Sequence, residues 1–366
     1  MTSTTRQPSA LPKFYIAGMG MITPVGGNTA TTAAALNAGI SAYGESRFYN
    51  KNRKPITMAA VPALAFEQMD VEIDEGERYN EQQDHVIKMA IAAIGQACDE
   101  QPLEGPIPLV LAFPEVEAQA DFISSSKLIQ NLSHNCQPWI DPQLSRSLHN
   151  GRASGIEALS FAYEYLYEPY GDYVLIGGSD SYRHYSRLDL LDADDRLMVA
   201  GSQDSFAPGE AGCFLLLTKN PANAMARDGH IVALSQPGLA HEPGHMYNDE
   251  AYRGEGLASA FKETLDKHPT SDIHTIYSSM NGENFWAKEL GVAQLRNKSA
   301  FRDPVAVRHP ADGYGDLGAA TAPALIALAA TDLLERKEAS THLVYSSSDY
   351  GLRGAVLVDR QEVQQR

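Results

Sequence analysis

The most informative part of this chain is Ser147–Leu159, which reads S-L-H-N-G-R-A-S-G-I-E-A-L. A polar turn with two glycines leads directly into an apolar helical pattern over Ile156–Leu166. The first turn of a helix exposes unpaired N–H groups and the positive end of the helix dipole. Arg152 stands at this end, where a permanent positive charge is unfavourable. An arginine at such a turn therefore requires an explanation.

On both sides of this stretch, short apolar runs alternate with longer helical patterns, which is typical of a layered α/β fold. Several runs are almost entirely apolar, as expected of strands covered on both faces. The predicted strands are Phe14–Gly18, Leu109–Phe113, Tyr173–Gly177, Cys213–Thr218, His230–Leu234, Thr275–Tyr277, His342–Ser346 and Ala355–Asp359. The predicted helices are Ala30–Asn37, Asp84–Glu100, Gly155–Leu166, Leu257–Asp266, Asn284–Leu290 and Gly318–Arg336. We expect a flexible tail over 1–13 and a single domain over 14–366.

Composition restricts the classes of partner. The chain has 366 residues, 43% of them hydrophobic, and a net charge of −17 without a run of Lys or Arg. This argues against nucleic acid and against an anionic membrane surface. Three scattered cysteines and a polar N-terminus without an apolar signal segment favour the cytoplasm. The apolar stretch Gly318–Leu334 is too short to span a bilayer and is predicted to be a buried helix.

Five segments, taken in order, resemble the β-ketoacyl synthases of the thiolase superfamily. They are Ile16–Gly26 (I-A-G-M-G-M-I-T-P-V-G), the stretch quoted above, Asp172–Asp180 (D-Y-V-L-I-G-G-S-D), Phe206–Leu217 (F-A-P-G-E-A-G-C-F-L-L-L) and Gly315–Ala324 (G-D-L-G-A-A-T-A-P-A). The resemblance implies a thiolase fold, a pseudo-duplicated α-β-α-β-α five-layer α/β domain. Its halves are expected at about 14–218 and 219–366.

The catalytic residues of that family do not have counterparts here. Claisen condensation requires a cysteine that holds the acyl chain and two histidines that assist decarboxylation. The resemblance places the cysteine position at Arg152, the first histidine at Asn281 and the second at Gly315. The preceding lysine falls near Pro310, and the late glycine-rich loop reads S-D-Y-G-L-R over Ser348–Arg353. We therefore expect no catalytic residues and no cofactor.

The altered loops have gained acids. Glu283 lies beside Asn281, Asp316 lies beside Gly315, and Asp349 lies in the altered glycine loop. If these loops converge as in the family, at least one carboxylate should hold Arg152, because an unpaired buried guanidinium is costly. The expected order is Asp349, then Asp316, then Glu283. The alternative is that Arg152 reaches solvent through an open pocket.

Two other patterns have simpler interpretations. His241–His245 matches H-E-x-x-H, but that zinc motif works only on a helix, and Pro243 and Gly244 interrupt one. A surface loop without metal is predicted. Cys213 falls inside a predicted buried strand, and Cys136 is interpreted as structural.

Three functions remain open at this stage. The first is an inactive ketosynthase-like protein that binds another protein, similar to thiolase-like proteins encoded beside bacterial type VI secretion effectors, where an adaptor or chaperone role is suspected. The second is a chain-length-factor-like subunit of a fatty acid or polyketide synthase. The third is an acyltransferase of the 3-oxoacyl-carrier synthase type with altered chemistry.

We expect a homodimer, or a heterodimer with a related chain, joined along an edge strand at Tyr173–Gly177. An acyl carrier protein is a further candidate partner.

Overall fold

The structure is a computed structural model that describes residues 11–67, 69, 78–119, 121–167, 171–270, 272–336 and 340–363. Residues 1–10 of the expected tail lie outside the described residues. One large mixed sheet is built from two sets of five strands. The first set is β1 (Phe14–Ile22), β4 (Ile107–Ala112), β5 (Ile140–Leu148), β6 (Tyr173–Ser181) and β7 (Glu210–Thr218). The second is β9 (His230–Leu234), β11 (Ile273–Ser278), β12 (Phe301–Arg308), β13 (Thr341–Ser347) and β14 (Leu352–Glu362).

Both sets have the same topology. The first runs β1-β7-β6-β4-β5, and the second runs β9-β14-β13-β11-β12. In each set the first two pairings are antiparallel and the last two are parallel. The sets join where Phe14 and Tyr15 of β1 pair with Leu234 and Ala233 of β9. This repetition is the signature of a pseudo-duplicated fold, although the exact boundaries 14–218 and 219–366 remain a prediction.

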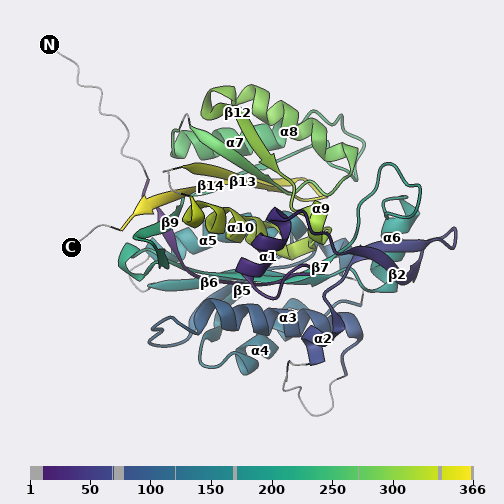
Figure 1. Ribbon diagram of the computed structural model, residues 1–366, viewed down its shortest axis with the longest axis horizontal. Helices are drawn as coiled ribbons and strands as arrows, with labels where there is room; N and C mark the ends of the chain where they lie inside the picture. Colours follow the sequence, from purple (N-terminus) through teal and green to yellow (C-terminus); the bar gives the residue numbers. More distant parts are fainter. Residues whose placement is uncertain are drawn as a thin grey trace.

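Helices complete five layers, which Figure 1 shows stacked from top to bottom. Outer helices α7 (Glu255–Lys267) and α8 (Asn284–Arg296) cover one face, and α3 (Glu81–Cys98) and α4 (Ser125–Asn135) cover the other. Between the two halves of the sheet lie α1 (Thr29–Asn37), α5 (Ser154–Tyr167) and α10 (Thr321–Glu335). Contrary to the expectation, helix α10 and the turn before it are long and apolar enough to cross a membrane by length and composition. The predicted buried helix is confirmed, since this stretch lies in the core.

Glycines allow α3 to lie directly on the sheet. A Cβ on Gly18 of β1 would come within 2.1 Å of the carbonyl oxygen of Ala97, and one on Gly212 of β7 within 2.5 Å of that of Met89. Neither position has room for a side chain. The glycines of the I-A-G-M-G and E-A-G-C segments are therefore required by close backbone packing.

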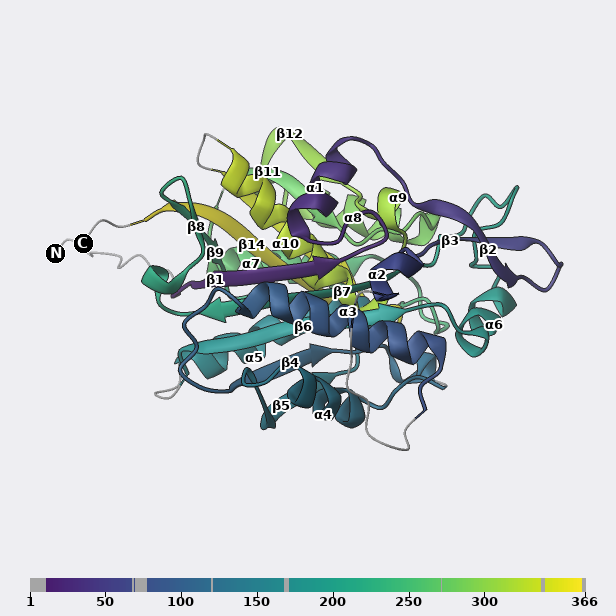
Figure 2. The same ribbon diagram turned by 60° about the horizontal axis from the view of Figure 1, so that its bottom comes forward.

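A smaller lobe projects at one end of the molecule (Figure 2). It contains the hairpin of β2 (Tyr43–Tyr49) and β3 (Pro55–Ala59) and helix α6 (Tyr185–Ala193). Phe48 and Tyr185 pack edge to face between them, with ring centroids 4.9 Å apart. The remaining short elements are α2 (Ala63–Glu67), β8 (Ala226–Arg227), β10 (Gly238–His241), α9 (Ala311–Tyr314) and the 3-10 turns η1 (Val116–Ala118), η2 (Gly151–Ala153), η3 (Pro221–Asn223), η4 (Lys298–Ala300) and η5 (Gly318–Ala320).

All predicted strands and helices are present, but one expectation about them is wrong. Tyr173–Gly177 is not an edge, because β6 pairs with β7 on one side and β4 on the other. Every residue of β6 is buried, as expected of a central strand. The edges of the large sheet are β5 and β12, whose polar and proline-containing sequences produced no strand signal.

Candidate functional site

The turn that carries Arg152 follows β5 and begins the buried helix α5. Gly151 has a positive φ of 51° and its N–H donates to the carbonyl of Phe113 at 3.0 Å. Ser154 closes the turn: its hydroxyl accepts from the N–H of Asn150 at 2.7 Å and donates to the carbonyl of Leu148 at 2.9 Å. Arg152 is held at the N-terminal end of α5 and is only 3% exposed. It does not reach solvent.

Two carboxylates pair with Arg152. Its Nη1 donates to Oδ2 of Asp316 at 3.0 Å, and its Nη2 donates to Oδ1 of Asp349. The guanidinium also lies over the ring of Trp286, with its central carbon 4.3 Å from the ring centroid. Two predicted partners, Asp349 and Asp316, are therefore in place. Both compensate the cost of burying a cation at a helix N-terminus.

A second arginine, Arg196, was not anticipated. It forms a two-pronged ion pair with Glu283, at 2.7 Å from Nε to Oε1 and 2.8 Å from Nη2 to Oε2. Its Nη1 donates to Oδ2 of Asp349 at 2.7 Å, so Asp349 bridges Arg196 and Arg152. Glu283, the third predicted partner of Arg152, pairs with Arg196 instead. Arg196 lies in an irregular segment after α6, where no sequence motif indicated a role.

Asn281 and Gly315 are the residues that the resemblance places at the two histidine positions, and neither has a side chain that can act as a base. Asn281 Nδ2 donates to Glu283 at 3.0 Å and to Asp316 at 2.9 Å. Gly315 has a φ of 75°, and a Cβ there would lie 2.6 Å from the carbonyl oxygen of Ala207. The backbone at Gly315 therefore leaves no space for an imidazole.

The ion pairs shift the acidity of the carboxylates. Burial disfavours the charged form of Asp349, but Arg196 and Arg152 outweigh it and lower its pKa to about 2. Glu115 behaves in the opposite way, since burial and repulsion by Asp349 raise its pKa to about 7. Its carboxylate packs against Gly151, where a Cβ would approach it to 2.0 Å, and accepts a hydrogen bond from Ser348 at 3.0 Å.

One nearby arrangement looks like a hydrolase relay. His149 Nε2 lies 2.9 Å from the hydroxyl of Ser147, and Nδ1 lies 2.7 Å from Nε2 of Gln119. Because Gln119 Nε2 also donates to the carbonyl of Pro114 at 2.8 Å, it is the amide nitrogen that faces the ring. Nδ1 therefore accepts and Nε2 carries the proton. His149 donates to Ser147 and does not activate it.

The other candidate nucleophiles and ligands are inert in this arrangement. Cys98, Cys136 and Cys213 are all buried, and burial raises the pKa of the first two thiols to about 12 and that of Cys213 higher still. Pro243 and Gly244 of the H-E-x-x-H match lie in a loop, as predicted. Among the described residues, no group of three or more His, Cys, Asp or Glu side chains is arranged to hold a metal ion.

The space around the network is small. Beside Asn281 and Asp316 lies a cavity of about 10 Å³, room for one water molecule. A larger cavity of about 140 Å³ reaches the other side of the network and is lined by Glu115 and Asp349 among others. Neither cavity is large enough for a long acyl chain.

The comparisons with known proteins bear on this geometry. No protein-family model matches the sequence, and no curated protein is similar to it. Solved structures are similar. The ishigamide ketosynthase/chain length factor superposes with a TM-score of 0.75 at 15% identity, over 96% of this chain and 99% of that one. The chain has the thiolase-like ketosynthase fold.

Two further structures agree. A type II polyketide synthase ketosynthase, in complex with its acyl-carrier protein, gives a TM-score of 0.71 at 14% identity over 95% of this chain and 99% of that one. The oxazolomycin ketosynthase domain of Streptomyces albus JA3453 gives 0.76 at 13% identity over 97% and 75%. The predicted fold class is confirmed. At such low identity the likeness establishes the fold and not the activity.

Proposed function

We propose that this protein is a non-catalytic member of the ketosynthase-like fold and acts by binding another protein. The observation that carries the proposal is the position of Arg152. It occupies the turn before α5, where the resemblance places the acyl-carrying cysteine, and it is held between Asp316 and Asp349. A guanidinium cannot accept an acyl group, and this one is buried and paired with two carboxylates.

The surrounding chemistry supports the same conclusion. Condensation needs a thiolate, an imidazole that stabilises the enolate oxygen and a second imidazole for decarboxylation. Asn281 can donate a hydrogen bond, but its Nδ2 is already engaged by two carboxylates. Gly315 supplies no side chain. The five residues Arg152, Asn281, Glu283, Asp316 and Asp349 therefore serve to close the former site rather than to perform chemistry.

The second candidate is a chain-length-factor-like subunit that shapes the pocket of a partner ketosynthase. Two of the similar structures are described as a ketosynthase/chain length factor and as a ketosynthase complex with an acyl carrier, and this chain covers 99% of each matched chain. Coverage of nearly the whole of each matched chain supports this role. The cavity beside Asn281 and Asp316, at about 10 Å³, is far too small for an acyl chain and weighs against it.

Intact-mass measurement tests the non-catalytic proposal. After incubation with acyl-carrier and acyl-CoA thioesters, we expect the 39.7 kDa chain to keep its mass. The buried thiols and the absent nucleophile give the acyl group nowhere to attach. A stable adduct on Cys98, Cys136 or Cys213 would overturn the proposal and restore the acyltransferase hypothesis.

A pull-down from the native host separates the two binding roles. Recovery of an active ketosynthase with its acyl carrier supports the chain-length-factor role. Recovery of a secretion effector supports the adaptor role suspected for thiolase-like proteins in type VI clusters.

A further inference from the structure

The cavity of about 140 Å³ is built from four segments that are distant in sequence: the region of η1, helix α6, the loop around Tyr247 and the altered glycine loop. Its lining combines phenol rings with carboxylates. The carboxylates are Glu115, Glu117, Asp194 and Asp349, and two of the rings are Tyr247 and Tyr350. Of these residues, the sequence indicated a role only for Asp349, as an ion-pair partner of Arg152.

The carboxylates leave this cavity with an excess of negative charge. Asp349 is neutralised by two arginines. Glu115 accepts from Ser348 but has no ion-pair partner among the described residues. Glu117 and Asp194 are exposed at the rim and likewise form no ion pair within the described ranges of the chain. A cation that enters the cavity would therefore meet two carboxylates, those of Glu117 and Asp194, that form no ion pair in the described part of the chain.

The aromatic walls favour a cation independently of the carboxylates. Tyr247 and Tyr350 stack with ring centroids 4.8 Å apart and an interplanar angle of 25°. The faces of such rings attract ammonium and guanidinium groups. The third ring, Tyr182, already shows this contact, because the guanidinium of Arg187 lies 3.7 Å from its centroid.

Arg187, one of the lining residues, has one unpaired donor. Arg187 pairs with Asp180 through its two Nη atoms, but its Nε has no acceptor in the part of the chain that the structure describes. Arg187 is only 4% exposed, so an unpaired N–H there is costly. This N–H is covered by the protein itself and does not reach a ligand. The carboxylates and the tyrosine rings, and not this donor, therefore select the ligand.

We propose that this cavity receives a lysine or arginine side chain from a basic segment of a partner protein. Helix α6 would support that segment, because Leu190, which lines the cavity, is 51% exposed. The chain's net charge of −17 attracts such a segment from a distance. This inference rests on the proposed binding function and names the chemistry of its partner. An acidic acyl carrier does not fit it.

Fluorescence anisotropy with two labelled, end-capped peptides tests the proposal on the full-length protein. One peptide alternates Arg and Gly, and the other alternates Glu and Gly. The basic peptide should bind at an ionic strength of about 0.15 M, where interactions beyond about 8 Å are screened, and the acidic peptide should not. Equal binding of both, or binding of neither, would overturn the proposal.

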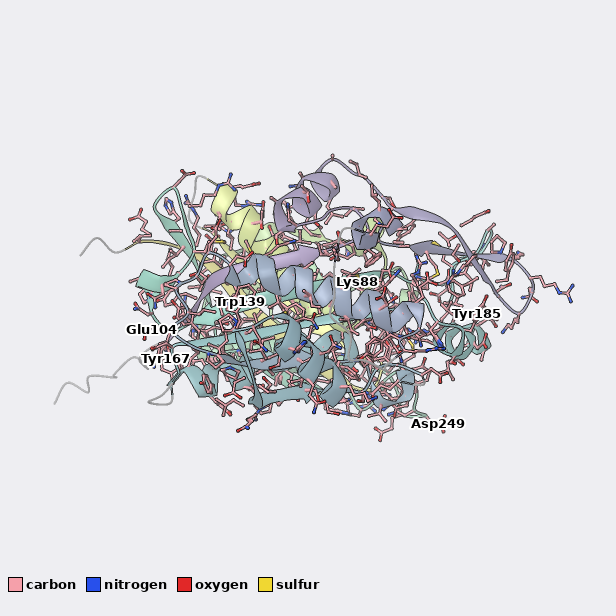
Figure 3. The ribbon with its side chains drawn as sticks, turned by 90° about the horizontal axis from the view of Figure 1, so that it is seen from below. Lys88, Glu104, Trp139, Tyr167, Tyr185 and Asp249 are labelled. Atoms are coloured by element: carbon pink, nitrogen blue, oxygen red, sulfur yellow. The ribbon has the colours of Figure 1, made fainter. Side chains whose placement is uncertain are left out.

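Matched variants locate the site. Glu117→Gln with Asp194→Asn should weaken the basic peptide about tenfold, which corresponds to about 1.4 kcal/mol. The control, Glu104→Gln with Glu164→Gln, removes the same charge from exposed positions away from the cavity. Figure 3 shows Glu104 at the opposite end of the molecule from Tyr185 of α6. Equal losses in both double variants would mean diffuse attraction to the net charge and would overturn the proposal.

Two further measurements distinguish the ligand class. Tyr350→Leu keeps the bulk of the wall but removes its aromatic face, and should weaken the peptide about threefold to tenfold. Spermine, which carries ammonium groups but no peptide chain to lie along α6, should compete poorly with the peptide. Competition by spermine at equal charge concentration would assign the cavity to polyamines instead. Failure of the peptide to bind would not change the intact-mass result. The binding-site proposal and the non-catalytic proposal can therefore fail separately.

Discussion

Arg152 carries its charge at the end of α5 where a cation is least stable, and its partners make that position tenable. Asp316 and Asp349 pair with it directly, and Glu115 lies beside Gly151 at the same helix end. Negative groups are favoured there by the helix dipole. The arginine and the acids therefore depend on each other, because either alone would be a buried charge without compensation.

Removing one side of this pairing should be costly. Arg152→Ala is expected to lower the free energy of unfolding by about 3–5 kcal/mol, since it leaves Asp316 buried without its cation. Urea unfolding measures the change. Arg302→Ala, which breaks the exposed pair with Asp272, serves as the control and should cost at most about 1 kcal/mol. A loss below about 1 kcal/mol at Arg152 would contradict the buried pair.

Glu115 predicts a specific pH dependence. Its folded pKa of about 7 lies above the ordinary value of a glutamate, so between about 4.5 and 7 the folded protein holds a proton that the unfolded chain has lost. Its contribution to the unfolding free energy therefore falls as pH rises through this range, by on the order of 2 kcal/mol. Urea unfolding of Glu115→Gln and of the wild type at several pH values isolates the contribution of Glu115 to the unfolding free energy. Parallel pH curves for the two proteins would contradict the raised pKa.

At the scale of elements, the crossing of α5 and α10 positions the turn that holds Arg152. Gly155 lies in the first turn of α5, and a Cβ there would come within 2.5 Å of Cδ of Pro323 in α10. The proline ring is rigid and cannot yield easily. The small residue thus sets how closely the two central helices approach.

A pair of glycine substitutions tests this crossing. Gly155→Ala should destabilise the protein by about 1–3 kcal/mol through overpacking, despite the better helix propensity of alanine. Gly291→Ala in α8, where a Cβ meets nothing within 4 Å, should stabilise it by about 0.5–1 kcal/mol. Thermal unfolding compares them directly. Stabilisation by both substitutions would contradict the close contact between Gly155 of α5 and Pro323 of α10.

At the scale of the whole molecule, the expected homodimer remains a prediction. Its interface can no longer be assigned to β6, because β6 is a central strand. The exposed edge nearest the turn of Arg152 is β5, and an unpaired edge invites pairing with a second chain. Light scattering should give about twice the chain mass of 39.7 kDa. Leu144→Lys, on exposed β5, should shift the protein toward monomer, whereas Leu295→Lys on exposed α8 should not. A monomeric wild type would remove the basis for assigning β5 to an interface.

The sequence alone determined the buried elements and the fold class, and it placed Arg152 at the turn before α5. These depend on local apolar patterns and on residues at positions set by chain order. The sequence also predicted Asp349 and Asp316 as ion-pair partners of Arg152, because the loops that carry them converge in the fold that it resembles. Only the tertiary structure decided that Arg196 captures Glu283, that Tyr247 and Arg187 line the cavity, and that β6 is central while β5 is the edge. A charged or aromatic residue in an irregular loop leaves no periodic signal, and strand order depends on pairings between distant segments that local sequence does not encode.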